Sequence, residues 1–244
     1  MQTVSFSFFR FDTIGARAWA FSMMGFARPM MRRIPDLQFW KLCGSGVGEG
    51  FTPIPNTAVY AVLATWPDKA TAQARIAEYK PFTLYRDKAV ETLTVYLEAT
   101  SARGEWSGVA PFQPKGALGD GPVAALTRAT VKPKVAAQFW RRVPDISAVV
   151  GKDPNVRFKI GVGEVPLVQQ VTFSIWPDVP TMNAFARTGP HGEAIKAVRE
   201  GKWFREELYA RFRVVGIEGT WEGREPLRDL PGAPQDSEPE AIPA

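Results

Sequence analysis

The sequence predicts an α+β fold made of two tandem ferredoxin-like (βαββαβ) units whose sheets pack together into one barrel. Three observations lead to this prediction. Four short motifs occur twice, in the same order and with offsets near 110 residues. Each half reads as strand, helix, strand, strand, helix, strand. A sheet covered by helices on one face must bury its other face, and two copies can do so against each other.

The repeated motifs set the boundaries of the units. They predict an N-terminal unit over residues 1–106, a linker over 107–122 and a C-terminal unit over 123–223. The matching pairs are Arg32-Arg33-Ile34-Pro35-Asp36 with Arg141-Arg142-Val143-Pro144-Asp145, Gly46-Val47-Gly48-Glu49 with Gly161-Val162-Gly163-Glu164, Trp66-Pro67-Asp68 with Trp176-Pro177-Asp178, and Gly104-Glu105-Trp106-Ser107-Gly108 with Gly219-Thr220-Trp221-Glu222-Gly223.

The first half contains the predicted elements in this order. Apolar and β-branched runs predict strands at Val4–Phe11, Leu37–Cys43, Thr57–Trp66 and Leu93–Leu97. Helices are expected near Ala16–Met31 and from Asp68 onward. The first helix is very apolar, which indicates core packing, while a pocket wall for a lipid-like substrate near a membrane is the alternative.

The second half repeats the plan. Strands are expected at Val123–Thr130, Val156–Val162, Val168–Trp176 and near Tyr209–Val215, with a turn at Gly163–Pro166. Pro133 suits the first turn of a helix through Arg142, and Asp178 is a predicted N-cap of the next helix. Residues 224–244 are rich in proline and acid and predict a disordered tail.

Composition excludes several classes of function. The chain has one cysteine and one histidine, so an intrachain disulfide and a Cys/His zinc site are ruled out. The net charge is +5, without the aromatic-interleaved basic runs of a nucleic-acid surface. An acidic protein partner, peripheral contact with an anionic membrane and an ordinary solvated surface all stay open. No signal peptide or membrane-spanning run is visible, so we expect a cytoplasmic protein, with peripheral contact with a membrane as the alternative.

His191 is the sharpest candidate for chemistry. It opens a predicted helix between Thr188 and Gly201, on the same face as Ile195 and Val198. A helix start disfavours the charged imidazolium and leaves a neutral nitrogen that can bind metal, and a single axial histidine can hold haem. Gly192 would let a flat macrocycle approach the backbone. The repeat offset matches His191 with Pro81, so a histidine occurs at this position in one unit only. The alternative is a half-buried histidine with a structural role.

Three other features are weaker. Cys43 is the rival iron ligand. It lies at the end of a predicted strand with Lys41 as its one obvious basic neighbour, which favours a buried, inert thiol. The glycine-rich run 44–50 does not fit the G-x-G-x-x-G spacing of a dinucleotide site. Glu49 and Glu164 match across the repeat, which favours a role in hairpin turns over acid/base catalysis. No catalytic residue is assigned.

Five stretches of the second half carry a family resemblance. They are Phe158–Pro166, Val168–Asp178, Gly189–Gly192, Ala194–Gly201 and Trp203–Phe212. They resemble the spheroidene monooxygenase family, the acyclic carotenoid 2-ketolases of purple phototrophic bacteria. The likeness covers nearly the whole chain except the tail, and it is denser in the second half than in the first.

The resemblance implies a haem-dependent oxygenase that takes O2 and electrons from reduced ferredoxin. It implies two hydroxylations at C2 of spheroidene or a related acyclic carotenoid, which yield the 2-ketone. A wider likeness to dimeric α/β-barrel haem proteins, which bind haem in one ferredoxin-like unit, implies an intrachain barrel of this kind with His191 as axial ligand. Gly192, next to it, and Arg128, on the first strand of the second half as a distal or propionate contact, are the other candidate cofactor contacts. Two alternatives remain: a haem peroxidase or chlorite-dismutase-like enzyme, and a non-catalytic haem- or lipid-binding barrel.

Overall fold

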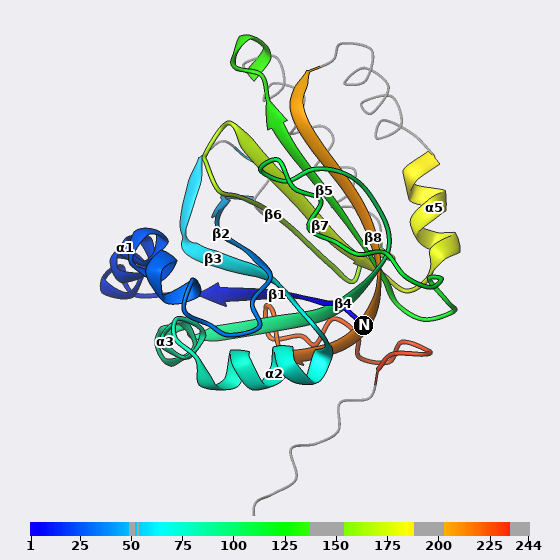
Figure 1. Ribbon diagram of the computed structural model, residues 1–244, viewed down its shortest axis with the longest axis horizontal. Helices are drawn as coiled ribbons and strands as arrows, with labels where there is room; N and C mark the ends of the chain where they lie inside the picture. The colour runs from blue at the N-terminus through cyan, green and yellow to red at the C-terminus, as the bar shows by residue number, and fades with distance from the viewer. Residues whose placement is uncertain (49–51, 53, 137–153, 188–202, 235–244) are drawn as a thin grey trace, which may run out of the picture.

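The chain forms one barrel of eight antiparallel strands, with helices on its outside (Figure 1). The computed structural model describes residues 1–48, 52, 54–136, 154–187 and 203–234. Around the ring the strands follow the order β1-β3-β2-β6-β7-β5-β8-β4, so each unit contributes four neighbouring strands. The prediction of two ferredoxin-like sheets joined into a barrel is therefore confirmed.

The N-terminal unit contains strands β1 (Thr3–Arg10), β2 (Phe39–Gly46), β3 (Pro55–Trp66) and β4 (Glu91–Gly104). Its helices are α1 (Ile14–Met31), α2 (Lys69–Glu78) and α3 (Phe82–Lys88). The Thr13 hydroxyl accepts from Ala16 N–H at 3.2 Å and the Asp68 carboxylate accepts from Thr71 N–H at 2.7 Å. These bonds satisfy helix N-termini that otherwise lack partners.

The C-terminal unit contains β5 (Val123–Val131), β6 (Phe158–Gly163), β7 (Gln169–Trp176) and β8 (Phe204–Gly219). Pro133 begins the short 3-10 turn η1 (Pro133–Val135), and α5 (Val179–Arg187) follows β7. Asp178 caps α5 by accepting from Thr181 N–H at 2.7 Å, as predicted. The expected helical residues from 137 to 142, and those from 188 to 201, lie outside the described residues.

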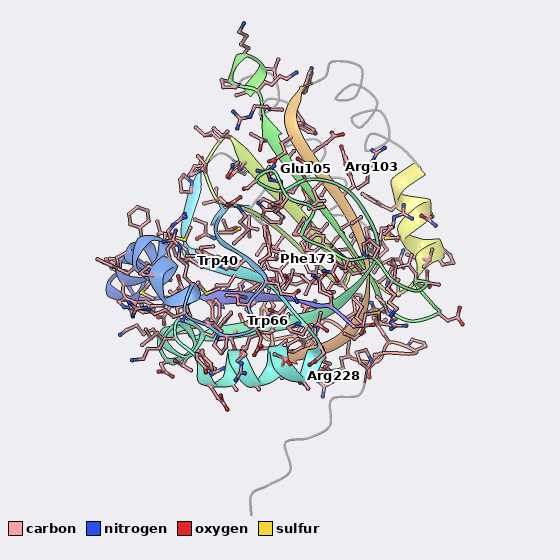
Figure 2. All side chains as sticks on the ribbon, in the orientation of Figure 1. Trp40, Trp66, Arg103, Glu105, Phe173 and Arg228 are labelled. Atoms are coloured by element: carbon pink, nitrogen blue, oxygen red, sulfur yellow. The ribbon has the colours of Figure 1, made fainter. Side chains whose placement is uncertain are left out.

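Alternate residues of every strand fill the interior of the barrel. Phe6 and Phe8 of β1 pack on Phe173 of β7, with ring centroids 5.1 and 6.0 Å apart. Phe173 lies in the middle of the ring (Figure 2). Because residues of both units meet here, neither sheet buries its inner face without the other.

A second core lies on the outside of the N-terminal sheet. The outward residues of β1, β2 and β3 pack against α1, α2 and α3, and Trp40 and Trp66 lie between the sheet and these helices (Figure 2). Among the helices that the structure describes, none combines the length and the hydropathy that a bilayer-crossing segment needs.

The two seams between the units differ in length. On one side β4 pairs with β8 from Leu93↔Gly219 to Gly104↔Leu208. On the other side β2 pairs with β6 only through Gly44↔Gly163 and Ser45↔Val162. The two units are therefore firmly joined along one edge and barely joined along the other.

The repeated Gly-x-Trp motif closes the two ends of the barrel. Trp106 follows β4 and Trp221 follows β8, and each forms a small bridged loop, with Val109 and Arg224 respectively. Gly104 has φ +101°, and a Cβ there would collide with the carbonyl oxygen of Glu207. A side chain at this position would be strained and blocked, which explains a glycine before this tryptophan.

Several expectations need correction. The chain after Asp68 forms two helices, and β4 and β8 run beyond their expected ends to Gly104 and Gly219. The strand registers equate Leu42, not Gly46, with Gly161. The supposed disordered tail begins too early, because Leu227 and Leu230 are buried in the barrel core. Composition averaged over the tail concealed these two apolar side chains.

Candidate functional site

The outer face of the C-terminal sheet carries small and polar side chains. Its central positions are Ala129 paired with Gln170, Gly161 paired with Thr172, and Lys159 paired with Ser174. These residues alternate with the interior residues Leu126, Ile160 and Phe173, so they point outward. We call these six residues the small-residue strip.

The equivalent face of the N-terminal sheet is bulky. There the same register positions hold Phe9 paired with Tyr60, Leu42 paired with Val62, and Trp40 paired with Ala64. These residues pack under α1 and its neighbours. An aromatic side chain buries about 150–250 Å², so these positions of the C-terminal sheet offer less side-chain surface than the equivalent positions of the N-terminal sheet. The two outer faces therefore carry side chains of different size at equivalent positions.

The predicted haem contacts fall in different parts of the chain. His191 and Gly192 lie outside the described residues, a few positions after α5. Trp176, Met182 and neighbouring apolar residues form a small core where α5 meets the C-terminal sheet. Among the described residues no group of three or more metal-ligating side chains is present. Haem needs only one protein ligand on its iron, so this finding is compatible with a single histidine site.

Arg128 faces the interior of the barrel at its Trp106 end. Its side chain is only 1% exposed, and it is ion-paired with Glu206 of β8. The guanidinium carbon lies 5.7 Å from the centre of a Trp106 ring, in cation–π range. Within the described part of the chain, Arg128 Nε has no hydrogen-bond partner. A haem on the outer face of this sheet would not contact this side chain directly.

Glu206 is held as a carboxylate in this position. Partial burial acts to raise its pKa, but the N–H groups of Gly108 and Ser107 and the Arg128 guanidinium outweigh burial, and the pKa lies below its ordinary value. Gly108 N–H donates to Glu206 at 2.8 Å. The same carboxylate therefore holds the Trp106 loop and neutralises the buried arginine.

A second charged pair completes the polar end of the barrel. Lys41 Nζ lies 2.9 Å from the Glu164 carboxylate, which also accepts from Trp106 Nε1 at 2.6 Å. Glu164 thus has a larger role than the predicted turn, while Glu49 lies outside the described residues. Cys43 is fully buried nearby, and burial raises the pKa of its thiol. This agrees with an inert thiol and not with an exposed reactive one.

Sequence reasoning missed this network because its members lie on five separate segments. The one available signal was the repeated tryptophan motif. At the other end of the barrel, Trp221 packs on Phe8 and Phe158, and the Arg10 guanidinium carbon lies 4.6 Å from the centre of its ring. Phe8 is the counterpart of Arg128, so the two barrel ends have diverged from a shared plan.

A pocket of about 230 Å³ lies at the short seam between β2 and β6. Phe21 and Met24 of α1 form one wall, Gly44 and Tyr60 form the base, and the β6–β7 turn forms the other wall through Pro166 and Leu167. Gly163 and Gln170 also line it. Both belong to the outer face of the C-terminal sheet, so the pocket leads directly onto the small-residue strip.

Comparison with known proteins identifies the family. No family model matches the chain. It is 51% identical over its whole length to spheroidene monooxygenase of Cereibacter sphaeroides, covering 76% of that protein. It is 52% identical to spheroidene monooxygenase of Rhodobacter capsulatus, over 93% of this chain and 96% of that protein. The crystal structure of an aldoxime dehydratase shares the fold, with a TM-score of 0.59 and 9% identity over 87% of this chain and 81% of that one. The chain therefore belongs to the spheroidene monooxygenase family of monooxygenase enzymes.

Proposed function

We propose that the chain is a haem-dependent monooxygenase that introduces a 2-keto group into an acyclic carotenoid such as spheroidene, with O2 and reduced ferredoxin as co-substrates. Family membership supports the reaction class and the carotenoid substrate. The small-residue strip carries the cofactor part of the proposal. It carries small side chains on one outer face, whereas bulky residues fill the equivalent positions of the other outer face, and we infer that a flat ligand packs on the strip.

The residues present suit a haem on that face. His191 would be the axial ligand and Gly192 would allow close approach of the ring. Ala129, Gly161 and Thr172 would offer a flat floor without projecting side chains. Lys159, itself part of the strip, has a cationic side chain that suits a haem propionate. Arg128, which points into the barrel, would act on the fold and not on the cofactor.

The proposed reaction is an oxidation repeated at one carbon. A bound haem would supply O2 activation, with the protein providing ligation, placement and exclusion of water. Each hydroxylation replaces one hydrogen at C2 by a hydroxyl group, consumes one O2, two protons and two electrons from ferredoxin, and releases the second oxygen atom as water. The resulting geminal diol loses water to give the ketone. The chain must therefore place the same carbon at the site of oxidation in both turnovers.

The first experiment is an absorption spectrum of the purified chain after haem supply, for the wild type and for His191→Ala. The expected result is a Soret band in the wild type that is lost or strongly shifted in the variant. An absent band in the wild type would refute haem binding, and an unchanged band in the variant would refute the ligand.

The second experiment fills the strip with the residues of the sister unit. Ala129→Phe with Gln170→Tyr recreates the Phe9–Tyr60 pair and should abolish the Soret band and ketone formation. The matched control is Ala125→Ser with Ser174→Ala, which also copies the sister unit but changes little volume. Equal haem binding by both double variants would place the cofactor elsewhere.

A further inference from the structure

We propose that the face around the β2–β6 pocket rests on an anionic lipid bilayer and that the pocket admits one end of the acyclic substrate from the membrane. This inference deepens the proposed function and rests on it for the identity of the substrate. Around the pocket, three separate segments of the chain expose large apolar side chains close to one another.

The apolar rim of the pocket consists of five exposed residues. Phe21 is 68% exposed on α1, Ile54 is 62% exposed before β3, and Leu167 is 48% exposed in the β6–β7 turn. Val47 joins Ile54 through the bond from Val47 N–H to Ile54 C=O at 2.9 Å, and Val165 lies in the same turn as Leu167. Exposed apolar residues are ordinary singly, but their gathering around a pocket marks a binding surface.

The charges beside the rim fit an anionic surface. Residues 13–34, which include α1, contain four arginines and no acidic residue. Arg28 donates to the carbonyl oxygen of Met24, a residue that lines the pocket. Exposed Lys132 and Lys134 follow β5, where Val131 N–H bonds to the carbonyl oxygen of Val168 beside the β6–β7 turn. Basic side chains around apolar ones are the pattern of peripheral binding to anionic lipid.

Glu164, the acidic residue that lines the pocket among the described residues, is held away from this surface. Glu164 lines the pocket, but its carboxylate is held by Lys41 and Trp106 at the polar end of the barrel. The described part of the rim therefore presents apolar and basic groups outward. Such a surface selects lipid over an acidic soluble protein, because its centre is apolar and only its flanks are charged.

The size and position of the pocket suit an elongated apolar chain. Pockets that enclose a whole drug-sized ligand have volumes of roughly 300–1,000 Å³. A pocket of about 230 Å³ can therefore take only one end of a long polyene. Gln170 and Gly163 connect it with Thr172 and Gly161 of the small-residue strip, two residues further along each strand. An end that enters here moves toward the proposed site of oxidation.

The membrane contact is tested by sedimentation of the full chain with phosphatidylcholine vesicles and with vesicles that also contain phosphatidylglycerol. The wild type should bind the anionic vesicles more strongly. Phe21→Asp with Leu167→Asp should lower the bound-to-free ratio by about tenfold or more, because two apolar anchors become charged. The control is Phe26→Asp, since Phe26 is 67% exposed on the same helix but lies about 140° around it. This control should bind like the wild type.

The pocket is tested by Gly44→Leu. A Cβ at Gly44 meets nothing within 4 Å, so a larger side chain can enter the pocket without a backbone clash, whereas a Cβ at Gly163 would collide with a carbonyl oxygen. Gly44→Leu should keep vesicle binding and the Soret band, and lower conversion of vesicle-borne spheroidene by about tenfold or more. The rim variant should lose conversion from vesicles. Ile54→Asp, at a rim position that does not line the pocket, should retain conversion when detergent delivers spheroidene.

The failure of this inference is distinct from failure of the proposed function. The docking surface is refuted if the wild type binds neither kind of vesicle or binds both equally. It is also refuted if Phe26→Asp weakens vesicle binding as much as the rim variant does. The pocket assignment is refuted if Gly44→Leu converts vesicle-borne spheroidene at the wild-type rate. A Soret band with ketone formation in detergent would leave the proposed function standing in each case.

Discussion

Replacing Glu206 by glutamine tests whether the polar end of the barrel is a buried ion pair. The substitution keeps an oxygen that can accept from Gly108 N–H, but it removes the negative charge beside Arg128. The Arg128 side chain is 1% exposed and the Glu206 side chain is 22% exposed. The buried guanidinium would therefore remain without a counter-charge from this partner.

The expected loss follows from this burial. Removing one partner of a buried pair costs about 3–5 kcal/mol, and the partial exposure of Glu206 favours the lower value. A loss of about 3 kcal/mol in a chain of this size lowers Tm by roughly 6–12 °C. The control is Glu98→Gln, because Glu98 pairs with Arg213, whose side chain is 44% exposed. An exposed pair contributes about 0–1 kcal/mol.

Urea unfolding and calorimetry measure both variants. Because the pKa of Glu206 is lowered in the folded chain, its stabilising contribution is present above its ordinary pKa and is lost as pH falls through the folded-state pKa. The wild type should therefore lose more stability below about pH 4 than Glu206→Gln does. Equal destabilisation by Glu206→Gln and Glu98→Gln would show that water screens Arg128 and would refute the reasoning.

Three further predictions concern separate parts of the fold. Cys43 is buried and its pKa is raised, so a thiol reagent at pH 8 should label it only in denaturant; rapid labelling of the folded chain would contradict its burial. Leu227→Ala should lower the free energy of unfolding by about 2–5 kcal/mol, since Leu227 packs in the barrel core, while Arg228→Ala on the exposed surface should not. Asp178→Ala should cost about 1 kcal/mol and Asp178→Asn much less, because either Asp or Asn can accept from Thr181 N–H; equal losses in urea unfolding would exclude the cap.

Local chemistry made much of the fold predictable. The β-branched runs located the strands, and Asp68 and Asp178 marked the helix starts through their side-chain oxygens. The duplicated motifs then implied a barrel, since each sheet had one uncovered face. These inferences depended on short stretches of chain, in which neighbouring residues determine the structure.

Longer-range features were not predictable in the same way. The strand Val123–Val131 has small or apolar residues on both faces, so alternation did not indicate which side Arg128 occupies. Its partner Glu206 lies 78 positions away, on a strand whose register only the folded barrel determines. The small-residue strip was equally hidden, because it becomes visible only when paired strands of the two units are compared position by position.

The unequal seams have a consequence for motion of the barrel. Separating β2 from β6 breaks pairing at only two positions, whereas separating β4 from β8 breaks a ladder along nearly the whole of β4. Local opening follows the least costly route, so the units should part at Gly44 and Gly163 while the far edge serves as a hinge. Amide hydrogens at this junction should exchange faster than those of β4. The barrel can therefore open between β2 and β6 while the four-stranded sheet of each unit keeps its structure.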